Sequence, residues 1–183
     1  MKRSLVGVAA GLLVFAATAN AQSMSKPVSF GIAGGMSVPT GDLGNVLSTG
    51  YNLSGMLNFR GPAWPVSLRV EGQWQHFGVT NVADANVKSI GGLANLVYGF
   101  GSKSMVRPYV TGGLGFFHIT SDFGNTCGLA DCSTSDNKFG FDVGAGLQFQ
   151  LTGISTFVEG DWQSIQTSGS ADHMFPIRVG VRF

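Results

Sequence analysis

Charged residues in this 183-residue chain recur at alternate positions, within segments that otherwise carry apolar and small side chains. Acids and bases on one face of a sheet can neutralise one another in a narrow interior, where an unpaired ion is costly. We assign eleven charges to such an inward face: Arg60, Arg69, Glu71, Lys88, Arg107, Lys138, Asp142, Glu159, Asp161, Arg178 and Arg182. The chemistry that this pattern predicts is ion pairing.

Six of these charges form the predicted ionic network of the interior: Arg69, Glu71, Asp142, Glu159, Asp161 and Arg178. If the last two strands pair, Glu159 falls near Arg178, and inward Ser29, Gly31, Ala33 and Gly35 leave room for the guanidinium. We expect Glu159, Asp161 and Asp142 to share Arg178 and neighbouring bases. The favoured role of the network is to fill the interior, and the alternative is a gate for small ions.

A second candidate for chemistry is His118, which Thr120 follows on the same strand face. A hydroxyl beside a His can become an activated nucleophile, but no acidic residue that would orient this His is evident. A His at a membrane boundary is therefore the favoured interpretation, also for His76 and His173. We therefore predict no catalytic residue and no cofactor. Because the His residues do not cluster at metal-ligand spacing, we also predict no metal.

Cys127 and Cys132 are the only cysteines, and both lie in a polar stretch. In an exported chain a disulfide forms and persists, so we predict that they form a bridge. A metal pair is less favoured, because no further Cys or His nearby completes a tetrahedral site.

The first residues are typical of an export signal. A basic start is followed by an apolar run over 5–18 and by Ala19-Asn20-Ala21, a small-x-small cleavage pattern. We predict a signal peptide over 1–21 and one domain over 22–183; an uncleaved anchor is the alternative. Removal of Lys2 and Arg3 changes the formal charge from +1 to −1, so no nucleic-acid partner is expected.

The rest of the chain divides into eight segments of alternating polarity, the period of a β-strand. The last segment shows it best, with Phe, Ile, Val, Val and Phe at odd positions and Pro, Arg, Gly and Arg between them. In the fourth, Leu93 and Val97 break the pattern. The predicted segments cover residues 28–38, 51–60, 66–75, 88–100, 109–116, 138–150, 158–163 and 175–183.

The connections alternate in length. Those at 61–65, 101–105 and 151–154 are short, and those at 39–48, 78–87, 120–137 and 165–173 are longer. Short periplasmic turns and longer external loops are typical of transmembrane barrels. A soluble barrel also alternates, but with the apolar face inside. Aromatic residues near strand ends and glycines on the charged face favour lipid outside, so we predict an all-β, eight-stranded antiparallel up-and-down transmembrane β-barrel.

With these segments, Arg107-Pro108-Tyr109-Val110-Thr111-Gly112-Gly113-Leu114-Gly115 and the terminal Phe183, the chain resembles the small outer-membrane β-barrel family of Gram-negative-type bacteria. That family includes the outer membrane protein A transmembrane domain and the outer membrane protein X group. The resemblance implies the cell outer membrane as location, its lipids and the barrel-assembly machinery as partners, and a monomer. It also implies that the last strand is an assembly signal, formed by Phe175, Ile177, Val179, Val181 and Phe183.

The resemblance favours a structural or surface-interaction role for a barrel whose polar lumen is filled by side chains, and not an enzyme. A narrow porin-like channel for small solutes or ions is the alternative. Less favoured is a lipid A-modifying enzyme, because lipid A deacylases resemble the local His-x-Ser pattern, whereas here Thr120 stands in the Ser position.

Overall fold

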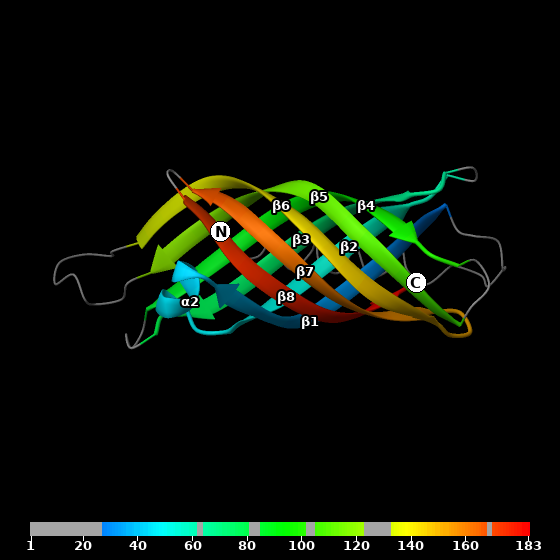
Figure 1. Cartoon of the computed structure of the whole chain (residues 1–183), viewed down its shortest axis with the longest axis horizontal. Helices are drawn as coiled ribbons and strands as arrows, with labels where there is room; N and C mark the ends of the chain where they lie inside the picture. The colour runs from blue at the N-terminus through cyan, green and yellow to red at the C-terminus, as the bar shows by residue number, and fades with distance from the viewer. Residues whose placement is uncertain (1–26, 62–63, 81–84, 102–104, 123–132, 168–169) are drawn as a thin grey trace, which may run out of the picture.

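The computed structural model describes residues 27–61, 64–80, 85–101, 105–122, 133–167 and 170–183. Eight antiparallel strands form one closed barrel, in which each strand pairs with its neighbours in sequence and β8 returns to β1 (Figure 1). The strands are β1 (Val28–Thr40), β2 (Gly50–Phe59), β3 (Ser67–Gly78), β4 (Asn86–Gly99), β5 (Val106–Asp122), β6 (Ser133–Gln150), β7 (Ser155–Thr167) and β8 (Ser170–Arg182). The predicted all-β, eight-stranded fold is confirmed.

The alternating sequence produces two faces of opposite chemistry. The outward Ile90 and Leu114 are 60% and 57% exposed, whereas the inward Glu159 and Asp142 are 0% and 2% exposed. A continuous apolar exterior of this kind requires an apolar solvent, because soluble monomers rarely expose large apolar patches. The apolar face is therefore the outer one, and the alternative of a soluble barrel with a greasy interior is wrong.

Lys88 corrects one of the eleven inward assignments. It shares the outward face of β4 with Ile90, its side chain is 45% exposed, and its Nζ lies 3.3 Å from Oδ2 of Asp122. Lys88 stands near the start of its strand, where a long side chain can hold its charge outside the apolar band. Its predicted inward placement was wrong because the position within β4, and not the charge, sets the face.

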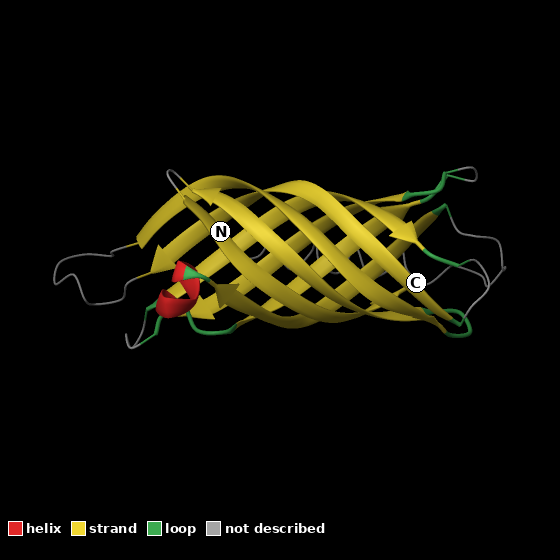
Figure 2. Ribbon diagram, in the orientation of Figure 1, coloured by secondary structure: helices red, strands yellow, loops and turns green. Residues whose placement is uncertain are grey.

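The two ends of the barrel differ (Figure 2). One end, here called the turn end, carries both Val28 and Phe183 and the connections between β2 and β3, β4 and β5, and β6 and β7. The opposite end, here called the α2 end, carries the short helix α2 (Asp42–Val46). Within the described residues, no helix is long and apolar enough to cross a membrane.

Two of the predicted loops are shorter than expected. Strands β5 and β6 stay paired out to Asp122 and Ser133, and β7 and β8 stay paired out to Thr167 and Ser170. The extensions of β5 and β6 are polar on both faces, so the alternation that marks a membrane strand is missing from them. Backbone pairing continues there because the ladder does not depend on an apolar face.

Two apolar layers lie inside the barrel, one toward each end. The α2-side layer consists of Leu47, Phe77, Leu93, Phe117, Ile165 and Met174, and Leu43 of α2 packs against it. The turn-side layer consists of Ala33, Met56, Val97, Tyr109 and Phe157. Leu93 and Val97, which break the alternation of the fourth segment, are thus inward residues that belong to these layers.

Inward glycines make room for the large side chains of these layers. The ring of Phe157, which is fully buried, lies over Gly180 of the neighbouring β8, where an added Cβ would overlap it. Gly160 on the outward face of β7 has nothing within 4 Å of the position that a Cβ would take. The two glycines therefore form a matched pair for mutation.

We predict that Gly180→Ala lowers the free energy of unfolding by about 1–3 kcal/mol, because the methyl group overpacks the lumen against Phe157. Gly160→Ala should stay within about 0.5 kcal/mol of the wild type, since its methyl group projects outward. Urea unfolding of the two variants in detergent micelles measures the difference. Equal stability of the two variants would contradict this account of the lumen.

Candidate functional site

The middle of the lumen is a layer of charge between the two apolar layers. The inward face of β7 shows the order, running Phe157, Glu159, Asp161, Gln163 and Ile165, from the turn-side layer to the α2-side layer. The inward face of β3 repeats it with Arg69, Glu71, Gln73, Gln75 and Phe77. The strands therefore place acids and bases at one depth, followed by amides.

Arg178 is the centre of this charged layer. Its Nη2 donates to Oε1 of Glu159 at 2.6 Å and to Oδ2 of Asp161 at 2.8 Å, while its Nη1 donates to Oε1 of Glu71. Glu159 and Arg178 are direct partners in the β7–β8 register. One guanidinium thus connects β8 with both β7 and β3.

Arg69 makes the second connection between distant strands. Its Nη1 lies 2.8 Å from each carboxylate oxygen of Glu159, and its Nε donates to Oδ1 of Asn58 at 3.3 Å. The guanidinium also lies 5.8 Å from the centre of the Tyr109 ring. Because Glu159 also binds Arg178, the two cations and their acids form one continuous network, here called the lumen network.

Asp142 occupies a different position from the expected one. Its Oδ2 accepts a hydrogen bond from Nδ2 of Asn95 at 2.7 Å, and the ion pairs of Arg178 among the described residues are with Glu71, Glu159 and Asp161. Asp142 stands on β6 and Asn95 on β4, so this hydrogen bond also joins strands that are not neighbours in the barrel. The hydrogen-bond partner of Asp142 is therefore an amide, and not the expected Arg178.

A layer of amides separates the lumen network from the α2-side layer. Nε2 of Gln75 donates to Oε1 of Gln163, and Nε2 of Gln163 donates to Oε1 of Gln73, each at 3.2 Å. Nδ2 of Asn52 donates to the Ser37 hydroxyl at 2.9 Å. The glutamine bonds join β3 with β7 on opposite walls of the barrel, as the ion pair of Arg69 does, whereas the Asn52 bond joins the adjacent strands β1 and β2.

Burial decides what this arrangement can do chemically. The side chains of Arg69 and Glu159 are 0% exposed, and those of Glu71, Asp161 and Arg178 are at most 3% exposed. Ions so far from water are stable only when they are paired, so the network braces the barrel and fills its cross-section. Within the described residues, no group of three His, Cys, Asp or Glu side chains is placed to hold a metal.

His118 lies outside the lumen. It faces outward on β5 near the α2 end, and its Nδ1 lies 2.9 Å from Oδ1 of Asn137 on β6. His76 and His173 also lie on the outer face, next to Trp74 and Trp162. A rim of aromatic and imidazole rings is typical of side chains at a membrane boundary.

Two further sets of predicted residues have a simpler outcome. Cys127 and Cys132, like the signal peptide at 1–21, lie outside the described residues. In the last strand Phe175, Ile177, Val179 and Phe183 are exposed on the outer face, and Val181 is half-buried there. Their role as an assembly signal stays a prediction.

The sequence interpretation missed the two apolar layers and the grouping of Arg60, Arg107 and Arg182 at the turn end. The signals for the layers were present, since Leu93 and Val97 occupy inward positions of the fourth segment. The grouping of the arginines depends on how three non-adjacent strands end at the same height, which one sequence does not show.

The sequence matches the family model for the outer membrane protein beta-barrel domain over residues 8–183. No curated protein matches it at a significant level. The fold is similar to that of Neisserial surface protein A, with 16% identity, a TM-score of 0.68, and coverage of 86% of this chain and 96% of that chain. The fold is also similar to that of a major outer membrane protein from Thermus thermophilus, with 11% identity, a TM-score of 0.62, and coverage of 85% of this chain and 98% of that chain.

The outer membrane enzyme PagL is also similar, with 15% identity, a TM-score of 0.53, and coverage of 85% of this chain and 98% of that chain. At these identities the likenesses show the fold alone. The closed barrel, the apolar exterior and the polar, side-chain-filled lumen define an integral outer-membrane β-barrel protein. The chain belongs to the outer membrane protein beta-barrel domain family, and its location is the cell outer membrane.

We predict that Arg178→Gln lowers the free energy of unfolding by about 3–5 kcal/mol and lowers the melting temperature, because it leaves the acids around it without their common partner. Lys88→Gln is the matched control, since it removes an exposed cation whose ion pair contributes at most about 1 kcal/mol. Heat-modifiable gel mobility and thermal unfolding in detergent measure both. An unchanged melting temperature in Arg178→Gln would rule out a bracing role.

Proposed function

We propose that this protein is a closed barrel with a structural or surface-interaction role in the outer membrane, and not an open channel. The observation that supports the proposal is the order of the side-chain layers along the lumen. A paired ionic layer and an amide layer lie between two apolar layers, and each layer joins opposite walls. An eight-stranded barrel is only wide enough for its own side chains, so these layers occupy the space that a water path needs.

The chain outside the membrane wall supports the surface part of the proposal. At the α2 end the structure places α2 and the polar extensions of β5 and β6 beyond the apolar band. Lys138 and Asp136 pair there, with 2.5 Å between Nζ and Oδ2. Loops on a rigid scaffold are where binding residues concentrate, so the external loops are the part of this barrel that meets a partner.

The direct test is conductance in a planar lipid bilayer. We expect the wild-type protein to give no discrete conductance steps under conditions in which a large porin does. Arg178→Gln should also stay closed, because both apolar layers remain in place when the network is broken. Reproducible steps from the wild-type protein would overturn the closed barrel and favour the narrow channel.

We further propose that the barrel catalyses no change in lipid A. The partner of His118 is the amide Asn137, whereas an acid on the same face, Asp122, pairs with Lys88. Mass spectrometry of lipid A should therefore give the same species with and without the protein. A new lipid A species that disappears in His118→Ala would show the opposite and assign an enzyme.

Processing and the disulfide can be tested together. We expect the protein purified from outer membranes without reductant to begin at Gln22, and to be lighter by two hydrogens than the same chain after reduction, because Cys127 and Cys132 are bridged. Intact-mass measurement before and after reduction tests both proposals. Cys127→Ser is the control, and it should show no change on reduction. A chain that still begins at Met1 would contradict the predicted signal peptide but not the disulfide.

A further inference from the structure

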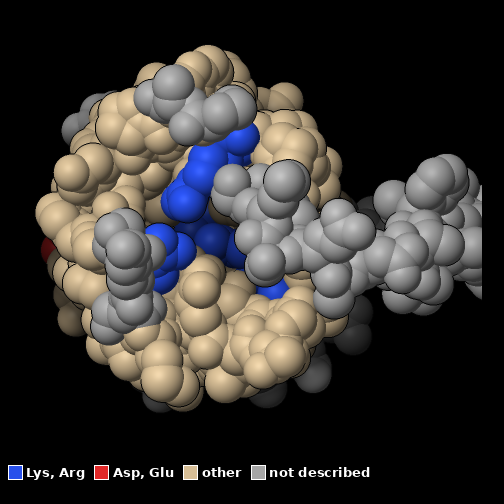
Figure 3. Space-filling model, turned by 90° about the vertical axis from the view of Figure 1, so that its right-hand side faces the viewer, with Lys and Arg blue, Asp and Glu red and all other residues tan. Residues whose placement is uncertain are grey.

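A basic hollow opens at the turn end of the barrel. Arg60 directly follows β2, Arg107 lies on β5, and Arg182 ends β8, and all three line one cavity of about 480 Å³. Figure 3 shows Lys and Arg side chains gathered in this hollow, with no Asp or Glu visible within it. The hollow, here called the vestibule, faces the side that carries the short turns.

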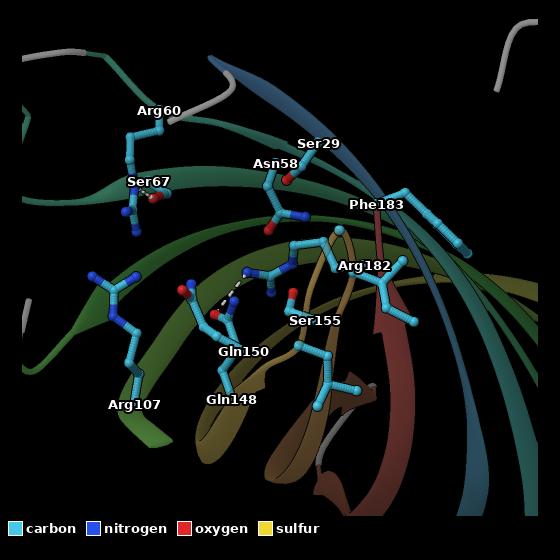
Figure 4. Close-up of a pocket in the computed structure, with 13 residues that line it drawn as sticks. Ser29, Asn58, Arg60, Ser67, Arg107, Gln148, Gln150, Ser155, Arg182 and Phe183 are labelled. Atoms are coloured by element: carbon cyan, nitrogen blue, oxygen red, sulfur yellow. Dashed lines mark hydrogen bonds between the residues drawn. The ribbon is translucent and has the colours of Figure 1, made fainter. Parts of the chain in front are cut away.

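The other side chains of the vestibule are neutral. Its remaining polar lining residues are Ser29, Asn58, Ser67, Gln148, Gln150 and Ser155 (Figure 4). No carboxylate side chain lines it among the described residues. The acids of the lumen network are separated from it by the turn-side layer and are already bound to Arg69 and Arg178. Among the described residues that line the vestibule, no acidic side chain therefore offsets the charges of Arg60 and Arg182.

Arg182 has hydrogen-bond donors directed into this space. Its Nη1 donates to Oε1 of Gln148 at 3.1 Å, while Nε and Nη2 are buried and have no acceptor among the residues that the structure describes. Its guanidinium lies 5.6 Å from the centre of the Phe157 ring, which belongs to the turn-side layer. Buried donors without an acceptor are costly, so an acceptor of opposite charge is favoured at this position.

Arg60 and Arg107 are held with their charged groups toward the same space. Nε of Arg60 donates to the Ser67 hydroxyl at 2.9 Å, and Nε of Arg107 donates to the carbonyl oxygen of Gly101 at 3.2 Å. In Figure 4 the two guanidiniums point toward one another across the vestibule. Like charges that face each other repel, and an anion between them converts that repulsion into attraction.

We propose that the vestibule binds an anion that carries a phosphate group. Guanidinium forks match the oxygens of phosphate, and a phosphate group offers more acceptor oxygens and more negative charge to several forks than a single carboxylate does. The phosphate can come from a free phosphate compound or from the headgroup of a phospholipid at the rim of the barrel. This site is independent of whether the lumen conducts.

The first experiment is isothermal titration calorimetry with inorganic pyrophosphate, on the full barrel folded in an uncharged detergent. We expect saturable binding that weakens with added salt. Arg182→Gln and Arg60→Gln should each weaken it about tenfold, since each removes hydrogen bonds to a charged group. Lys88→Gln is the matched control, because it removes one positive charge at the α2 end, and its affinity should equal that of the wild type.

The second experiment separates the two sources of phosphate. Native mass spectrometry compares retention of phosphatidylglycerol and phosphatidylcholine by the same proteins. Preferential retention of phosphatidylglycerol that is lost in Arg182→Gln, without pyrophosphate binding, assigns the site to a lipid headgroup. Absence of binding in both experiments overturns the proposal, and so does an equal loss in Lys88→Gln. If Arg182→Gln does not fold, Arg60→Gln carries the test, because Arg60 is exposed at the mouth.

Discussion

Hydrocarbon offers no partner to a backbone N–H or C=O group, and the structure depends on this constraint first. A sheet in lipid must satisfy every such group within itself, which only a closed ladder achieves. Here β8 returns to β1 over ten paired positions, from Gly31 with Arg182 to Thr40 with His173. Closure requires strands throughout, and strands impose the period of two that separates a lipid face from a lumen face.

The small number of strands then determines the chemistry of the lumen. In so narrow a barrel, side chains from opposite walls meet, and Arg69 on β3 reaches Glu159 on β7 at 2.8 Å. Their removal from water would be destabilising for either ion alone. It is tolerated because Arg178 and Glu71 complete the network, and because the apolar layers on both sides keep water from screening the attraction.

The parts of this arrangement that follow from neighbouring strands were predictable. The alternation separated two faces, the aromatic residues near strand ends and the glycines on the charged face placed the apolar face outside, and the pairing of the last two strands placed Glu159 near Arg178. The contact of Arg69 with Glu159 was not predictable, because the stagger of the closed barrel decides which residues of non-adjacent strands share a depth. The same reason explains why Asp142 reaches Asn95 instead of Arg178.

The two ends of the lumen show that position along a strand decides what a charge can do. Toward the α2 end, the inward faces end on apolar side chains such as Phe77 and Ile165, and Leu43 of α2 packs against them. Toward the turn end, beyond Phe157, β8 and β5 end on Arg182 and Arg107. Arg69 and Arg178 lie between the two apolar layers, where the lumen is closed, so each must have an acid of the chain as its partner. Arg182 lies on the other side of the turn-side layer, in a cavity that is open to solutes, so a solute can be its partner.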